Sequence, residues 1–155
     1  MNEILLIGPV GCGKTTLKKA ILGQDLTYRK TQALDFSHKL IDCPGEYLEI
    51  PRYYHVIIDL SHRSSEIWAL QSANSMRASY PPNFAKSFNR PVIGVITKSD
   101  RDDSDVEQAR EFLHLAGITG KIWVISALTG EGIDGLKRRL KRVSAGHVSN
   151  RGDLH

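Results

Sequence analysis

Near its start the chain reads Ile4-Leu5-Leu6-Ile7-Gly8-Pro9-Val10-Gly11-Cys12-Gly13-Lys14-Thr15-Thr16. Residues 8–15 fit the phosphate-binding pattern G-x-x-x-x-G-K-[ST]. The apolar run before them predicts a buried strand, and the residues after them begin a helical pattern that Gly23 ends. A glycine-rich turn between a strand and a helix points successive backbone N–H groups, and the positive end of the helix dipole, at one place. Residues 8–16 are therefore predicted to bind a polyphosphate.

Three residue types in this turn have separate roles. The glycines let the backbone wrap closely around a β-phosphate, and the Lys14 ammonium can reach the β- and γ-phosphates. The Thr15 hydroxyl can ligate Mg²⁺. We therefore expect Lys14 to act in catalysis as well as in binding, and Mg²⁺ to be a cofactor.

Composition and charge indicate one soluble domain. The chain has 155 residues, of which 41% are hydrophobic and 25% are charged, enough to bury a core. It lacks an apolar run of about 18 residues and a secretion signal, so we expect a cytoplasmic protein without a membrane span. Two cysteines, Cys12 and Cys43, are too few for a disulfide scaffold or a structural zinc site.

The net charge of +4 comes largely from the basic run at residues 137–142. Such a run near the end of a helix is predicted to be a solvated face, with a docking patch for an acidic partner as the alternative. Nucleic acid is not expected as a partner.

Apolar periodicity predicts alternating strands and helices. Strands are predicted at residues 4–7, 39–41, 66–73, 91–96 and 122–125, and helices at 14–22, 105–115 and 133–143. Residues 53–60 fit either a strand or a helical face, and residues 74–89 are predicted to form a loop with at most a short helix. This alternation implies a three-layer α/β sandwich with a mostly parallel sheet. The predicted domain covers residues 1–143, and residues 144–155 are expected to form a disordered tail.

Three more motifs follow predicted strands. In Asp42-x-x-Gly45 the aspartate can hold Mg²⁺ through water, and the glycine N–H can bond a γ-phosphate. Thr97-Lys98-Ser99-Asp100 fits [NT]-K-x-D, whose carboxylate can accept from the N1–H and N2–H₂ edge of guanine, a donor pair that adenine lacks. Ser126-Ala127-Leu128 fits an S-A-x loop that supports the base through a backbone N–H. Open α/β sheets bind ligands at the carboxyl ends of their strands, where all of these motifs fall.

Together the motifs resemble the small Ras-like GTPases, which are P-loop NTPases with a G-domain. A narrower resemblance rests on residues 30–33, 41–49 and 89–94, which are similar to the EutP/PduV family of ethanolamine- and propanediol-utilisation proteins, above all its PduV branch. The resemblance covers residues 1–142. It implies a cytoplasmic bacterial nucleotide-binding protein associated with metabolic microcompartments, with a shell or cytoskeletal protein as partner. It also implies a helix over residues 52–62.

The resemblance assigns further residues. Thr31 matches the switch threonine that ligates Mg²⁺ and senses the γ-phosphate, with Thr27 as the competing candidate. Glu46 is a candidate catalytic residue, because it stands where Ras-like enzymes carry a glutamine that orients the attacking water and a carboxylate could accept from that water. Its charge is repulsive near a γ-phosphate, and Val10 stands where the Ras branch carries glycine. Both departures predict slow hydrolysis. Thr97 replaces an asparagine, which predicts the loss of an amide that ties the base-binding loop to the P-loop.

These observations leave three functions open. The first is a switch that binds GTP or GDP with Mg²⁺ and hydrolyses GTP slowly, with adenine nucleotides as the less favoured ligand. The second is a small-carboxylate kinase of the acetate type that uses ATP. The third is a scaffold that binds nucleotide without turnover.

Overall fold

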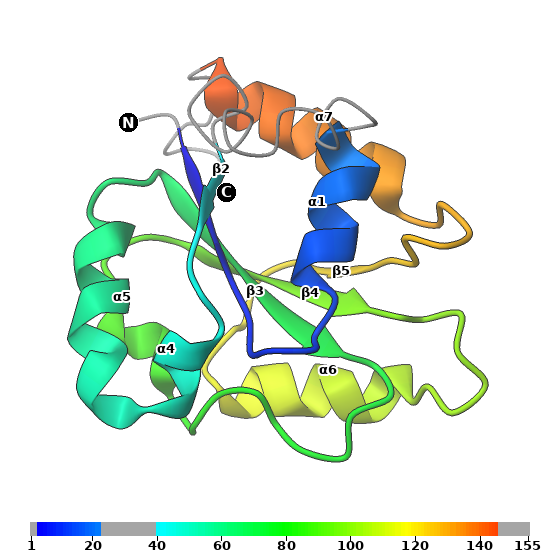
Figure 1. Ribbon diagram of the computed structural model, residues 1–155, viewed down its shortest axis with the longest axis horizontal. Coiled ribbons are helices and arrows are strands. Elements are labelled where there is room, and N and C mark those ends of the chain that lie inside the picture. Colours follow the sequence, from blue (N-terminus) through cyan, green and yellow to red (C-terminus); the bar gives the residue numbers. More distant parts are fainter. Residues whose placement is uncertain (1–2, 23–39, 146–155) are drawn as a thin grey trace.

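A five-stranded parallel sheet runs through the residues that the computed structural model describes, 3–22 and 40–145 (Figure 1). In spatial order its strands are β2 (Leu40–Asp42), β1 (Ile4–Ile7), β3 (Glu66–Ser72), β4 (Val92–Thr97) and β5 (Ile122–Val124). Every adjacent pair is parallel, so all carboxyl ends lie at one edge of the sheet. The predicted α/β class and parallel sheet are confirmed.

Helices cover both faces of this sheet (Figure 1). One face carries α1 (Lys14–Leu22) and α7 (Ile133–Ser144), which also pack against each other; the other carries α4 (Glu46–Glu49), α5 (Tyr54–Ser61) and α6 (Val106–Leu115). Side chains of a strand alternate between faces. In β1, accordingly, Leu5 and Ile7 enter one core while Ile4 and Leu6 enter the other. Three layers result, as predicted.

The ambiguous stretch at residues 53–60 is helical. A 3₁₀ turn, η2 (Pro51–Tyr53), leads into α5, so the helix that the family resemblance implies is confirmed and the alternative strand is wrong. Only one side of this segment is buried, where Ile57 and Ser61 are fully covered, and a helix presents one such side.

The predicted loop between β3 and β4 contains one short 3₁₀ helix, η3 (Phe84–Ser87). Its Phe84 ring stacks on Tyr80 with centroids 5.0 Å apart and meets Phe88 edge-on at 5.2 Å. Aromatic packing therefore joins this loop to the core, in a region whose serines, asparagines and prolines predicted only an irregular chain.

The basic run at residues 137–142 is not a wholly solvated face. Arg139 forms a two-point ion pair with Glu66 at the start of β3, with Nη2–Oε1 at 2.6 Å and Nε–Oε2 at 3.0 Å. Glu66 is fully buried and also accepts from Trp68 Nε1 at 2.8 Å. The hydrogen bond to Glu66 raises the pKa of Arg139 above its usual value. The prediction holds for exposed Lys137 and Arg138 and is wrong for Arg139.

Predicted boundaries differ little from those observed. The second strand spans Leu40–Asp42 instead of residues 39–41, and α7 extends to Ser144. Lys39 and the tail from residue 146 lie outside the described residues, so the predicted disorder of the tail stays a prediction. Within residues 3–22 and 40–145, no helix combines the length and apolar character needed to cross a membrane.

Candidate nucleotide-binding site

The P-loop, residues 8–13, turns sharply between β1 and α1. Gly11 and Gly13 have φ angles of +86° and +98°, in the left-handed region that favours glycine. At Gly8, a β-carbon would collide with Cys12 Sγ. These positions therefore need glycine for backbone conformation or for space, as the G-x-x-x-x-G pattern requires.

The P-loop carbonyls are held by hydrogen-bond donors. Thr97 Oγ1 donates to Cys12 O at 2.7 Å, and Lys98 Nζ donates to Gly11 O at 2.9 Å. Cys12 N donates to Pro9 O within the loop at 3.2 Å. The asparagine amide is absent, as expected, but the Thr97 hydroxyl reaches the P-loop in its place and keeps the base-binding loop tied to it.

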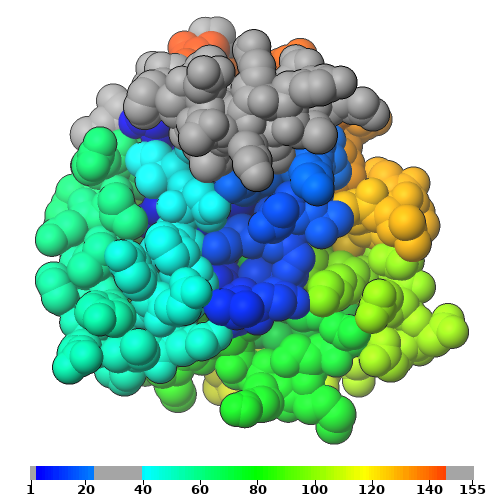
Figure 2. Space-filling model, viewed as in Figure 1, coloured from blue at the N-terminus to red at the C-terminus, as the bar shows by residue number. Residues whose placement is uncertain are grey.

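Two cavities adjoin at the carboxyl edge of the sheet. The first, of about 460 Å³, lies over the P-loop and is lined by Pro9, Val10, Gly11, Gly13, Lys14, Thr15, Thr16, Gly45, Glu46 and Lys98. The second, of about 230 Å³, is lined by Gly13, Thr16, Leu17, Thr97, Lys98, Asp100, Arg101, Ile125, Ala127 and Leu128. They share three lining residues and so form one elongated cleft. Figure 2 shows the blue surface of the P-loop and α1 exposed between the cyan residues after β2 and the yellow-green residues after β4.

The second cavity has a positioned carboxylate. Asp100 Oδ1 accepts from Ser126 Oγ at 2.8 Å, and the same hydroxyl oxygen accepts from Thr129 N at 3.0 Å. Ser126 is fully buried, and its N–H donates to Glu131 O at 2.9 Å. The sequence motif indicated a backbone role for the Ser126 loop and gave no sign that the serine side chain orients Asp100.

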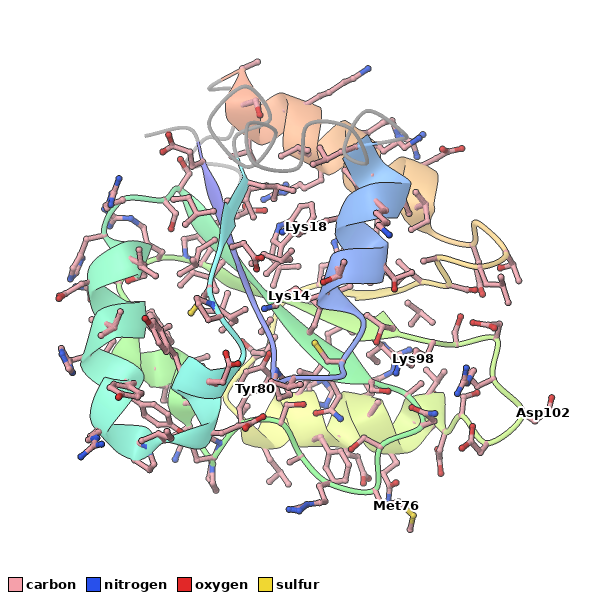
Figure 3. The ribbon with its side chains drawn as sticks, in the orientation of Figure 1. Lys14, Lys18, Met76, Tyr80, Lys98 and Asp102 are labelled. Carbon is pink, nitrogen blue, oxygen red and sulfur yellow. The ribbon has the colours of Figure 1, made fainter. Side chains whose placement is uncertain are left out.

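At the other end of the cleft, Lys14 faces β2 (Figure 3). Its Nζ donates to Cys43 O at 2.6 Å and lies 3.3 Å from Asp42 Oδ1. The Oδ1 atom is buried and makes no hydrogen bond of good geometry with the described residues, although the ammonium is close enough for an ion pair. A second lysine, Lys18, lies 2.7 Å from Asp42 Oδ2. No sequence motif marks Lys18, although its i,i+4 spacing from Lys14 places both on one helix face.

The Thr15 and Asp42 oxygens suit Mg²⁺ only when phosphate oxygens and waters complete its coordination. Among the described residues, no group of three or more His, Cys, Asp or Glu side chains could hold a metal ion. Mg²⁺ commonly uses one or two protein oxygens, several waters and substrate phosphates. The exposed Thr15 hydroxyl and the under-bonded Asp42 carboxylate fit that arrangement. Thr31 and its competitor Thr27 lie outside the described residues.

The chain after β2 packs directly on the P-loop. A β-carbon on Gly45 would lie 2.6 Å from Val10 N and 2.9 Å from Pro9 C, both backbone atoms that cannot move aside cheaply. Glu46, which begins α4, is exposed and lines the first cavity. Glu49 Oε2 accepts from Val10 N at 3.3 Å, a contact with no signal in the sequence pattern. Gly45 and Glu46 thus lie beside the P-loop, and their expected role at a terminal phosphate stays a prediction.

Buried titratable groups lie beneath the cleft. Burial raises the pKa of Cys12 and raises that of Cys43 to about 11, so both thiols stay protonated near neutral pH. Burial also raises the pKa of Tyr80, whose hydroxyl donates to Leu70 O at 2.7 Å. Cys12, Cys43 and Tyr80 are therefore uncharged near neutral pH and add no negative charge beneath the cleft.

Residues 1–142 match the profile of the family described as "Ethanolamine utilisation - propanediol utilisation", PduV-EutP. The chain belongs to the PduV-EutP family. One relative is the "Propanediol utilization protein PduV" of Citrobacter freundii, 37% identical over 86% of this chain and 89% of that protein. Another is the "Probable acetate kinase EutP" of Salmonella typhimurium, 36% identical over 81% of this chain and 80% of that protein.

Several solved structures of other proteins have a fold similar to that of this PduV-EutP chain. A probable GTP-binding protein engB superposes with a TM-score of 0.67 at 19% identity, over 93% of this chain and 99% of that one. The FeoB G-domain from Methanococcus jannaschii superposes with a TM-score of 0.61 at 18% identity, over 92% of this chain and 97% of that one. The fold is therefore that of a small Ras-like G-domain.

Proposed function

We propose that this PduV-EutP protein, linked by family to propanediol and ethanolamine utilisation, is a Mg²⁺-dependent guanine-nucleotide switch with slow GTP hydrolysis. The observation that carries the proposal is the Asp100 carboxylate, fixed by Ser126 in a cavity that joins the P-loop cavity. A guanine N1–H and N2–H₂ edge would meet an acceptor of fixed orientation there, while the phosphates would lie over the P-loop.

In this proposal the residues at the first cavity have separate roles toward the phosphates. P-loop N–H groups and Lys14 bind the phosphate oxygens, and Gly45 N–H donates to the terminal phosphate. Thr15 and Asp42 hold Mg²⁺, which supplies charge neutralisation when bound. Glu46 adds a negative charge near the terminal phosphate, so it repels the nucleotide and orients water poorly. That repulsion is the physical reason for expecting slow hydrolysis.

The proposed setting follows from the family. A cytoplasmic protein of diol or amine breakdown would act beside the microcompartments that enclose these reactions, and a shell or cytoskeletal protein would read the nucleotide state. The surface that would change with that state lies around α4, next to the terminal phosphate position.

The base assignment is tested by Asp100→Ala. Loss of the acceptor should weaken GDP binding about 10- to 100-fold, or about 1–3 kcal/mol if direct readout of bases is a fair guide, and leave ADP binding unchanged. Calorimetric titration of nucleotide-free protein with GDP and ADP, each with Mg²⁺, measures both. Asp102→Ala is the matched control, because Asp102 is exposed and Figure 3 shows it pointing away from the cleft. Equal losses of affinity for GDP and ADP, or an unsubstituted protein that binds ADP more tightly than GDP, would contradict guanine readout.

A second candidate is a kinase that transfers the γ-phosphoryl group of ATP to a small carboxylate. It is favoured by the relatives named "Probable acetate kinase EutP", which are 36% identical over 81% of this chain. The purified protein would then form an acyl phosphate from ATP and acetate, which hydroxylamine traps as a coloured iron-hydroxamate. A signal that disappears in Lys14→Ala supports the kinase, whereas nucleotide binding without trapped product or released phosphate supports the scaffold.

A further inference from the structure

Asp42 has two lysine partners, and only one of them lies at the cleft. Lys14 Nζ is 3.3 Å from Oδ1, and Lys18 Nζ is 2.7 Å from Oδ2. An α-helix has 3.6 residues per turn, so the two lysines are neighbours on one face of α1. Figure 3 shows both in the space between α1 and β2.

The two lysines differ in what else they can contact. Lys14 lines the first cavity and can leave Asp42 for a phosphate oxygen. Lys18 does not line that cavity and is only 6% exposed, and its ammonium makes no other hydrogen bond within residues 3–22 and 40–145. A buried ammonium without a partner is strongly unfavourable, so Lys18 keeps its pairing with Asp42 when nucleotide binds.

This pairing acts on the carboxylate expected to hold Mg²⁺. A hard divalent cation is attracted by the negative charge of its oxygen ligands, and a fixed ammonium at 2.7 Å offsets much of that charge. We propose, on the basis of the proposed function, that Lys18 is a positioning residue that competes for Asp42 and lowers the magnesium affinity of the nucleotide complex. It also fixes the orientation of the carboxylate.

The test measures the rate at which a fluorescent GDP analogue is released, at increasing concentrations of free Mg²⁺. Bound Mg²⁺ slows this release, so the Mg²⁺ concentration at which the slowing is half complete, the midpoint, reports the magnesium affinity. Lys18→Met removes the charge and keeps an unbranched side chain, so the midpoint should fall at least about tenfold. Lys19→Met is the matched control, because it changes the charge equally at the next, exposed position of α1. Its midpoint should match that of the original protein.

A second pair of variants separates charge from packing. Lys18→Arg keeps the cation and should keep the original midpoint, and Lys18→Gln keeps a donor without charge and should behave like Lys18→Met. Circular dichroism establishes that each variant folds, and Lys18→Gln replaces Lys18→Met if the latter does not. An unchanged midpoint in either folded, uncharged variant overturns the inference alone. An original protein that does not bind GDP overturns the proposed function and this inference with it.

Discussion

Replacing Lys14 by alanine should reduce the affinity for Mg²⁺–GDP and Mg²⁺–GTP at least about 100-fold. A hydrogen bond to a charged group contributes about 1.5–3 kcal/mol, and a hundredfold change corresponds to about 2.7 kcal/mol. Lys14 lines the cavity over the P-loop, and its contacts with Cys43 O and Asp42 show that its side chain extends from α1 to the end of β2. Calorimetric titration against the original protein measures the loss.

The control for this experiment is Lys19→Ala, which removes an exposed lysine from the same helix. It should bind nucleotide like the original protein, because it touches none of the cleft. Lys14→Ala also removes one of the two ion pairs of Asp42, so a thermal unfolding measurement should establish that the variant is folded before it is titrated. A folded Lys14→Ala protein that binds GDP normally would show that the P-loop is not the phosphate site.

Arg139→Ala should destabilise the fold by about 3–5 kcal/mol, the cost of leaving one partner of a buried ion pair uncompensated. Glu66 is fully buried at the start of β3, and after the substitution Trp68 Nε1 would be the one remaining donor to its carboxylate among residues 3–22 and 40–145. Urea unfolding measures the change through the midpoint and slope of the transition.

The matched control is Arg138→Ala, the exposed neighbour on α7, which should change stability by no more than about 0.5 kcal/mol. Equal effects of the two variants would mean that the pairing of Arg139 with Glu66 adds no stability beyond that of an exposed arginine. The double variant Glu66→Met with Arg139→Met should recover most of the loss, since well-packed apolar residues can replace a buried pair. Failure to recover would mean that the pair also determines how α7 docks on the sheet.

Local patterns predicted the parts of the site that are local in sequence. The P-loop is such a part, because the strand, the glycine turn and the helix that form it are consecutive, and the structure places it between β1 and α1. The alternation of apolar runs likewise predicted each strand to within a residue or two. What the sequence could not show is which distant groups meet.

The pairing of Arg139 with Glu66 illustrates this limit, since 73 positions separate them and a basic run on a helix is most often solvated. The helix at residues 54–61 illustrates another, because its local pattern fits both a strand and a helical face, and the family resemblance rather than that pattern implied the helix. The motif predicted the loss of an amide at Thr97 but not that the hydroxyl would reach the P-loop, because that reach depends on backbone spacing that no motif encodes.

The ties on the P-loop also affect the thermodynamics of binding. The Gly11 and Cys12 carbonyls are fixed by Lys98 and Thr97, and the Tyr80 hydroxyl bonds Ile7 O at the end of β1 and Leu70 O within β3, so groups of the protein itself hold the loop in place. Ordering a flexible loop on association costs conformational entropy, so a pre-organised loop leaves more of the phosphate contact energy as affinity. If the loop binds phosphates as proposed, most of the entropic cost of ordering it is therefore met when the chain folds.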